Sequence, residues 1–432
     1  MTVQAKIESG IQDVLQGAPA RPVLVTALAG AMQGVGGGLG WSLLPPLMPD
    51  IAADLSISHA MGGVVWGAAP FGIAVAAPMG GAAVDRWGAR WVAGLAIMVG
   101  ALACASRALA TGPWTMAIAM LGFGLHVGFV APAIPKILAS HVPLQNLGRA
   151  NGIALICYTF GTAITVLVAR TWLAPMLGGW RMAMVAAGVA MVLTGLLWLW
   201  LVRDRAALSR HAGLADVLKL AKNAQLMRVA GIQLLLFGGY LALLGSLPRL
   251  LTDAGMSASE VGVAVASWLG VAGVANLGGA WLSDKVGLRR PFIIGGAMLA
   301  AAALGIMAIV PGSPGLWLAV AAIGGGCFAP LVLTLPLELP GVGVSRAGAA
   351  LGLLLLVGQL GGFLLPVATG AVAGAGGFSA ALGLLAFAHL LIVVPAMGLM
   401  ETGSRARVGA AAMDPASAAV TGPVTSDAAS AS

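Results

Sequence analysis

The sequence predicts an all-α membrane protein with twelve transmembrane helices arranged as two six-helix bundles. Composition, the lengths of the apolar runs, and an internal repeat support this. Of the 432 residues, 59% are hydrophobic and 8% are charged, and the mean hydropathy is +0.99. A soluble domain is about 45–50% apolar and about 25% charged. So much apolar surface needs a bilayer to cover it.

The apolar runs have the length that a bilayer requires. A hydrocarbon core about 30 Å thick takes about 20 residues of helix. Short segments of alternating hydrophobicity, which are typical of membrane barrels, do not occur. The predicted spans are 23–47, 60–83, 91–110, 113–138, 148–173, 180–202, 229–252, 260–282, 290–310, 314–339, 346–373 and 377–400.

The positive charges predict the topology. If the N-terminus is cytoplasmic and the spans alternate, nearly all of the 22 Lys and Arg face the cytoplasm. The exceptions are Arg107, Arg170, Arg181 and Arg249. This positive-inside bias predicts a multi-pass protein of a bacterial-type inner membrane, with both termini cytoplasmic. The net charge of +8 then reports topology and contact with anionic lipid, and no nucleic-acid partner is expected.

The chain divides around one long polar interruption. We predict a cytoplasmic segment over 1–22, a six-helix bundle over 23–202, a linker over 203–228 and a second bundle over 229–400. Part of the linker and part of residues 1–20 have helical apolar spacing that suits the membrane surface, and a mobile N-terminus stays open as the alternative. The Ala- and Ser-rich tail over 401–432 is expected to be disordered, since it has too little apolar surface for a core.

The two halves repeat a charged motif in the loop after their second span. Asp85 and Asp284 lie 199 residues apart, and the same offset pairs Gly88 with Gly287. A glycine permits the tight turn, the Asp can cap a helix or bind a basic side chain, and such bonds can break in another conformation. We therefore expect a gate, although a plain topological anchor stays open. The expected gating residues are Gly81, Asp85, Arg86, Gly88, Arg90, Asp284, Lys285, Gly287 and Arg289, with Arg149 and Arg346 from a second echo after the fourth spans.

These features resemble the major facilitator superfamily. Its loop motif reads Gly-x-Leu-(Ala/Gly)-Asp-(Arg/Lys)-x-Gly-Arg-(Arg/Lys), and the copy at 81–90 departs from it at Ala83 and Ala89, while the second copy has Ala280 for the first Gly. The Gly179-Trp180-Arg181 stretch also agrees. The resemblance covers about residues 22–400. It implies two bundles that rock about a central cavity lined by spans 1, 4, 7 and 10, helped by 2, 5, 8 and 11.

Polar side chains deep within spans are the candidates for substrate contact, because such groups are expensive in hydrocarbon. Counting along each span places Gln33, His126, Tyr158, Tyr240 and Gln359 near the midplane, with Trp268 slightly above it. Arg249, at the outer end of span 7, is placed to attract anions. Alternatives stay open: a neutral His126 bonded inside the protein, and glutamines that join helices. For Arg107 and Arg170, snorkelling to the headgroups is favoured.

We expect transport of a small organic solute by alternating access, without ATP. No span carries Asp or Glu near its midplane, which disfavours cation carriage and tight proton coupling. A neutral or weakly anionic solute fits best. Efflux of hydrophobic compounds is the alternative, and a carrier-like sensor or assembly scaffold is an alternative of another class. We expect a monomer that is not an enzyme and has no cofactor and no metal site.

Overall fold

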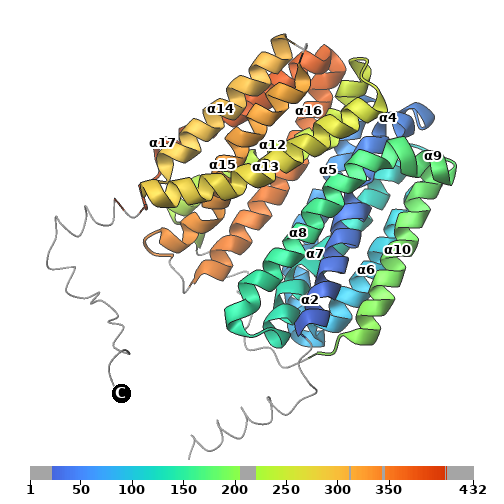
Figure 1. The fold of residues 1–432 in the computed structure, drawn as a ribbon, viewed down its shortest axis with the longest axis horizontal. Helices are drawn as coiled ribbons and strands as arrows, with labels where there is room; N and C mark the ends of the chain where they lie inside the picture. Colours follow the sequence, from blue (N-terminus) through green and yellow to red (C-terminus); the bar gives the residue numbers. More distant parts are fainter. Residues whose placement is uncertain (1–21, 205–219, 311–312, 343–345, 404, 406–432) are drawn as a thin grey trace, which may run out of the picture.

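The computed structural model describes residues 22–204, 220–310, 313–342, 346–403 and 405. Within these ranges the chain is a set of long helices that form two bundles. Figure 1 shows the two bundles side by side. The segments predicted to lie on the membrane surface (1–20 and most of the linker) and the tail beyond 405 fall outside the described residues.

The first bundle contains six spans. The spans are α2 (Pro22–Ala31), η1 (Met32–Leu39), α3 (Gly40–Ser42) and α4 (Leu44–Asp54) as one; α5 (His59–Trp87); α6 (Ala89–Ser106) with η2 (Arg107–Leu109); α7 (Pro113–His141); α8 (Leu144–Val168) with η3 (Ala169–Leu173) and α9 (Ala174–Leu177); and α10 (Trp180–Leu201).

The second bundle contains α12 (Ala224–Asp253), α13 (Ala258–Val286), α14 (Arg290–Ile309), α15 (Pro314–Glu338), α16 (Ala347–Leu391) and α17 (Val393–Met397). The described residues hold 11 helical stretches long and apolar enough to cross a membrane, and the last, Gly348–Met397, has 50 residues. Such a length exceeds what one crossing needs. The stretch bends at Gly377, where φ is 66°, and it therefore makes two spans. The predicted twelve-helix fold is confirmed.

The surface of the bundles is apolar, as a bilayer requires. Leu102, Trp200 and Leu277 are at least 70% exposed, and many other large apolar side chains are exposed with them. A soluble protein rarely exposes apolar surface on this scale. The chain is a multi-pass membrane protein.

Capping residues and glycines set the helix ends. The Ser58 hydroxyl accepts a hydrogen bond from the amide of Met61 at the start of α5, and Asn223 does the same for Leu226 at the start of α12. Gly88 and Gly287 follow α5 and α13 with φ of 85° and 75°. Residues with a Cβ adopt such angles with difficulty, so the predicted role of both motif glycines in the turn is confirmed.

Close helix contacts rest on small residues. A Cβ on Gly38 of η1 would lie 2.8 Å from the Cα of Gly161 on α8, and a Cβ on Gly34 would lie 3.2 Å from the carbonyl oxygen of Cys157. Without water between them, membrane helices associate through this kind of backbone approach. The first and fifth spans therefore pack closely at the middle of the first bundle.

The bundles meet where α4 contacts α12 and along two further seams. Figure 1 shows α13 reaching across toward the first bundle, where its first turns contact α8 and η3. The other seam joins α5 to α16. At that seam Gly67 lies so close that a Cβ would be 3.0 Å from the carbonyl oxygen of Phe363. Both contacts lie in the halves of the spans that are predicted to face outward.

Candidate functional site

A ladder of aromatic rings lies on the second bundle near the middle of its spans. The Tyr240 ring on α12 stacks on Trp268 of α13, with 5.4 Å between centroids and 30° between planes. Phe237, one turn earlier, lies 6.2 Å from Tyr240. Trp268 is buried, while Tyr240 is partly exposed. The predicted pair Tyr240 and Trp268 thus forms one flat apolar surface with a phenol group on it.

Two predicted residues of the first bundle lie opposite. Tyr158 on α8 lies near Tyr240, across the boundary between the bundles. Gln33 lies in η1, and the neighbouring Gly37 is close to both residues: its Cβ would be 2.7 Å from the Tyr158 ring and 3.9 Å from the Gln33 Oε1. The structure therefore brings Gln33, Tyr158, Tyr240 and Trp268 to one region.

The sequence does not reveal that η1 is a π-helix. Eight residues, Met32–Leu39, have the wider π turn, and this segment includes Gln33. Such turns are rare and are frequent at functional sites. Four glycines within it hint at an irregular backbone, but they do not specify its type.

Gln359 on α16 has an unmet hydrogen-bonding requirement. Its Oε1 is buried and has no partner among the described residues, and the same is true of the Asn276 Oδ1 on α13. A buried acceptor without a donor costs about 1–3 kcal/mol. Such atoms are suited to receive a donor from a solute or from water.

His126 is placed apart from this group. It is 3% exposed, and its Nδ1 donates to the carbonyl oxygen of Phe123 on its own helix. The ring lies against Gly100 of α6, where a Cβ would overlap it. The His126 side chain therefore faces the interior of the first bundle in this conformation.

Arg249 lies beside a small cavity between the bundles. The cavity has a volume of about 30 Å³, which is room for little more than water. Its lining includes His59, Trp66, Ser246 and Arg249. The Arg249 Nη1 is buried without a hydrogen-bond partner among the described residues, and its Nε lies 4.0 Å from the Asp253 carboxylate.

Polar contacts join the bundles on the inner and outer sides of this cavity. The Trp66 indole donates to the Leu241 carbonyl across the boundary, at 2.7 Å. His59 Nε2 lies 3.1 Å from the Asp253 carboxylate. Among the residues that the structure describes, these bonds between bundles lie in the outward half, so the path is shut on that side.

Arg170 belongs to the same closure. Its Nε and Nη2 bind the Asp50 carboxylate at 2.8–3.2 Å, and its Nη1 donates to the Thr252 hydroxyl of the second bundle at 2.9 Å. The favoured snorkelling position is wrong for Arg170, because a carboxylate holds it at the boundary. It is also wrong for Arg107, whose side chain is fully buried.

The first copy of the gating motif makes contacts within its own bundle. Asp85 pairs with Lys136 of α7. The backbone amide of Arg90 donates to the Asp204 carboxylate at 2.9 Å, and its guanidinium donates to the Leu199 carbonyl. The motif therefore ties the end of α5 to α7 and the start of α6 to the end of α10.

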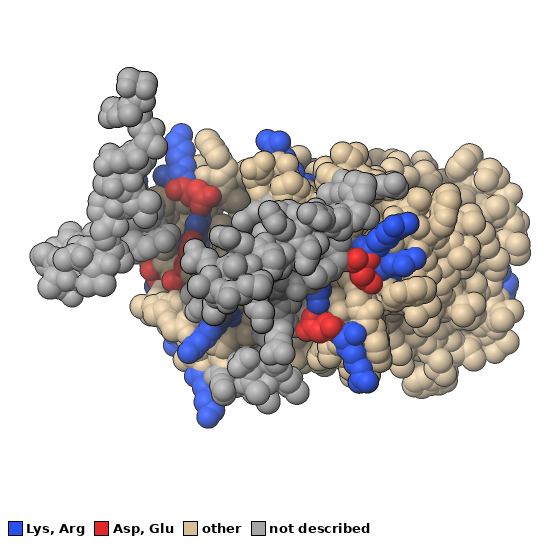
Figure 2. Space-filling model, turned by 90° about the horizontal axis from the view of Figure 1, so that it is seen from below, with Lys and Arg blue, Asp and Glu red and all other residues tan. Residues whose placement is uncertain are grey.

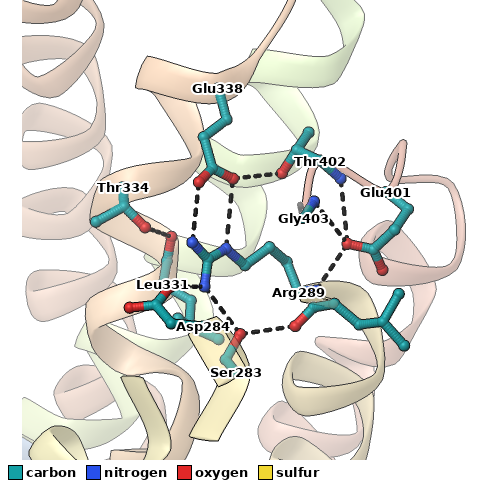
Figure 3. Close-up of polar contacts among 10 residues, drawn as sticks. Ser283, Asp284, Arg289, Leu331, Thr334, Glu338, Glu401, Thr402 and Gly403 are labelled. Atoms are coloured by element: carbon teal, nitrogen blue, oxygen red, sulfur yellow. Dashed lines mark hydrogen bonds and ion pairs between the residues drawn. The ribbon is translucent and has the colours of Figure 1, made fainter. Parts of the chain in front are cut away.

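The second copy builds a larger network (Figure 3). Arg289 binds the Asp284 carboxylate at 2.6 Å and the Glu338 carboxylate at 3.0 Å. Glu401 accepts from the backbone amides of Arg289 and Arg290 at 2.7 and 3.1 Å, at the start of α14. The hydrogen bonds of Glu338 and Asp284 to Arg289 raise the pKa of this guanidinium above its usual value.

The predicted disordered tail, 401–432, begins too early, because its first residues take part in this network. Glu401 and Thr402 are held in place, and the Thr402 hydroxyl donates to Glu338 at 2.6 Å. The sequence reasoning missed Lys136, Asp204 and Glu401 as partners. The available signal was an acidic residue just after the sixth span and another just after the twelfth.

The remaining gating candidates except Gly81 lie at the surface. Arg86 and Lys285 stack over Trp87 and Trp281 at 5.7 and 5.1 Å, and Arg149 and Arg346 are exposed. Gly81 is buried in α5. Figure 2 shows basic and acidic side chains gathered around the face seen from below, which is the predicted cytoplasmic face.

Comparison with known proteins decides the family. The sequence profile of the Major Facilitator Superfamily matches residues 31–366. The chain belongs to the major facilitator superfamily. This transporter family and the neighbours in structure are carriers rather than enzymes.

The chain is 25% identical to the gallate transporter of Pseudomonas putida over 397 residues, which cover 78% of this chain and 85% of that one. Its fold is similar to that of a bacterial homologue of the human lysosomal transporter Spinster in an inward-facing, occupied conformation, with a TM-score of 0.74, 18% identity, and 88% and 96% of the two chains covered. A D-xylose-proton symporter has a TM-score of 0.71 and 16% identity, with 88% and 98% covered.

Proposed function

We propose that this transporter moves a small neutral or weakly anionic organic solute across a bacterial-type inner membrane by alternating access, as a monomer with both termini in the cytoplasm. The Arg249 Nη1, buried and unpartnered among the described residues at the boundary between the bundles, carries the proposal. The Asp253 carboxylate lies 4.0 Å from the Arg249 Nε, so it pairs with that side of the guanidinium and leaves Nη1 available. A positive group facing the path favours anions.

The binding residues in this proposal are those that face each other across the boundary. Gln33 and Gln359 offer amide groups, and Tyr158, Tyr240 and Trp268 offer flat rings and phenols. The relative named for gallate supports an organic acid as the first solute to test. His126 faces α6 in this conformation, so contact with the solute would require its ring to turn away from Gly100.

The motif networks have a proposed role at the cytoplasmic face. The ion pair of Asp85 with Lys136 lies within the first bundle, and that of Arg289 with Glu338 lies within the second. We infer that they keep the helix ends of a bundle together while the bundles rock, which is a gating role by rigidity. Asp204 and Glu401 serve the two halves in the same way, each through the first amide groups of the third helix of its half.

Thermal unfolding of the purified protein with a panel of organic acids, neutral metabolites and drugs tests the solute class. A ligand at 100 times its Kd adds about 2.7 kcal/mol of stability, so one chemical class should raise the Tm. We expect Arg249→Gln to remove most of the rise seen with acids, because it deletes the guanidinium beside the cavity.

Arg181→Gln is the matched control, because Arg181 binds Asp54 at the outer rim within the first bundle. It should leave the rise intact. An equal rise with acids in wild type and Arg249→Gln would contradict the proposed role of Arg249.

Efflux of hydrophobic compounds is the second candidate, and the aromatic ladder of Phe237, Tyr240 and Trp268 favours it. Flat apolar surfaces accept varied ligands. A rise in Tm with many unrelated apolar compounds, unchanged in Arg249→Gln, would select efflux over uptake of an acid.

A further inference from the structure

Arg107 turns into the first bundle. It lies at the predicted outer end of the third span, in η2, yet none of its surface is exposed. Its Nη1 donates to the carbonyl oxygen of Gly40 at 2.8 Å, and its guanidinium lies 4.3 Å from the centre of the Phe123 ring. Both contacts lie well inside the bundle, between the first and fourth spans.

The other edge of this guanidinium has no partner among the described residues. Nε and Nη2 of Arg107 are buried without a hydrogen bond, and no carboxylate pairs with them in that part of the chain. The Trp41 Nε1 is a third buried donor without an acceptor. Trp41 follows Gly40 in sequence and packs edge-on against Phe123 at 6.2 Å, so its ring and Arg107 both lie against the Phe123 ring.

In two other arginines of this protein, the Nε/Nη2 edge binds a carboxylate. Nε and Nη2 of Arg170 hold the two oxygens of Asp50, and Nε and Nη2 of Arg289 hold those of Glu338. This planar fork matches a carboxylate or another small anion. Arg107 presents the same fork, in a low-dielectric setting where an uncompensated charge is strongly unfavourable.

The Phe123 ring and the Gly40 carbonyl compensate only part of this charge. A ring face attracts a cation, and one carbonyl accepts one hydrogen bond. Neither uses the Nε/Nη2 edge. Water would accept from these donors, but only an anion would also neutralise the charge.

The geometry points to a binding site for a small anion, held by the Nε/Nη2 edge of Arg107 with the Trp41 indole N–H as a further donor. The anion is an inorganic ion or the carboxylate of the transported solute. Trp41 packs against Trp66 at 5.5 Å, and Trp66 bonds to Leu241 of the other bundle. Parting of the bundles at the outer face would break that bond and open a way to the site. This inference goes beyond the proposed function, since an inorganic anion would bind even if no solute in the panel did.

Thermal unfolding of the full chain in detergent, at constant ionic strength, tests the site. Sodium gluconate is replaced stepwise by sodium bromide in one series and by sodium benzoate in another. We expect the Tm of wild type to rise with the logarithm of the anion concentration in at least one series, and Arg107→Gln to abolish the rise. A rise with bromide assigns an inorganic anion, and a rise with benzoate alone assigns the carboxylate of a solute.

Trp41→Phe keeps the ring and removes only the N–H, so it should fold and shift the response to at least threefold higher anion concentration, on the order of one lost hydrogen bond. Arg107→Lys serves if Arg107→Gln does not fold, because it keeps the charge and loses the fork. Arg181→Gln should respond as wild type does.

No rise in either series, or an equal rise in wild type and in both Arg107 variants, would overturn the site. A rise with benzoate that only Arg249→Gln abolishes would also overturn it, while leaving the proposed function in place.

Discussion

Replacing Gly63 by Leu should hold the transporter open at its outer face and reduce transport strongly. Gly63 lies on α5 where this helix touches α16, and a Cβ there would overlap the carbonyl oxygen of Pro366. That oxygen belongs to backbone and cannot turn aside as a side chain would. Overpacking costs about 1–3 kcal/mol, and such a cost shifts a conformational equilibrium about 5- to 150-fold.

Labelling of a cysteine at position 246 measures this shift. Ser246 lines the small cavity below the closed outer contacts, so Ser246→Cys should react slowly with a membrane-impermeant maleimide in an otherwise cysteine-free background. We expect Gly63→Leu to speed the reaction from the outer face. Gly270→Leu is the matched control on α13, because nothing lies within 4 Å of its Cβ position, and its rate should match that of the parent.

If folded Gly63→Leu protein reacts at the parental rate, closure does not depend on this backbone contact. If reaction is fast in the parent already, the outer path is open in the membrane, and the closed contacts belong to a minor state.

The depth of each residue in the bilayer was predictable from the sequence, but the direction in which its side chain points was not. Rise per residue fixes depth in the bilayer, which is why Tyr158, Tyr240 and Trp268 do lie together. The same count places His126 at their level, but its direction depends on which neighbouring helix has room. Gly100 of α6 provides that room, and no count along α7 alone could show it.

The inward orientation of the Arg107 side chain was likewise not predictable from the sequence. An arginine at the end of a span usually extends toward the headgroups, and the sequence gives no reason to expect otherwise. Arg107 points into the bundle because of two contacts. These are the Gly40 carbonyl of the first span and the Phe123 ring of the fourth span. Contacts of this kind arise only when distant helices pack.

The two loop motifs were predictable from the sequence, but the hydrogen-bond partners that connect them to other helices were not. The repeated Asp and Gly mark the turns after α5 and α13, and their glycines have the expected positive φ. Their partners lie far along the chain, at Asp204 and at Glu401, and short spacing rules do not reach them. Glu401 falls in a segment whose composition predicts disorder. It is nevertheless ordered, because a carboxylate at the start of a helix can hold a segment that has no core of its own.

Arg289→Ala should strongly lower the stability of the second bundle. The Arg289 side chain is 12% exposed and its partner Glu338 is 13% exposed. Removing this guanidinium takes hydrogen bonds from the carboxylates of Glu338 and Asp284, and a bond to a charged group contributes about 1.5–3 kcal/mol. Thermal unfolding in detergent should show a clear fall in the Tm, and Glu338→Gln should lower it by a smaller amount, because the amide keeps one acceptor for the guanidinium.

Lys285→Ala is the control from the same motif, because Lys285 is exposed and its ammonium lies over the Trp281 ring at 5.1 Å. Its removal should cost no more than about 1 kcal/mol. Equal losses of stability in Arg289→Ala and Lys285→Ala would show that the network adds nothing beyond a surface anchor. A large loss confined to Arg289→Ala, with transport by the remaining folded protein also reduced, would show instead that the motif couples helix ends, since an anchor at the membrane face has no need of a buried carboxylate.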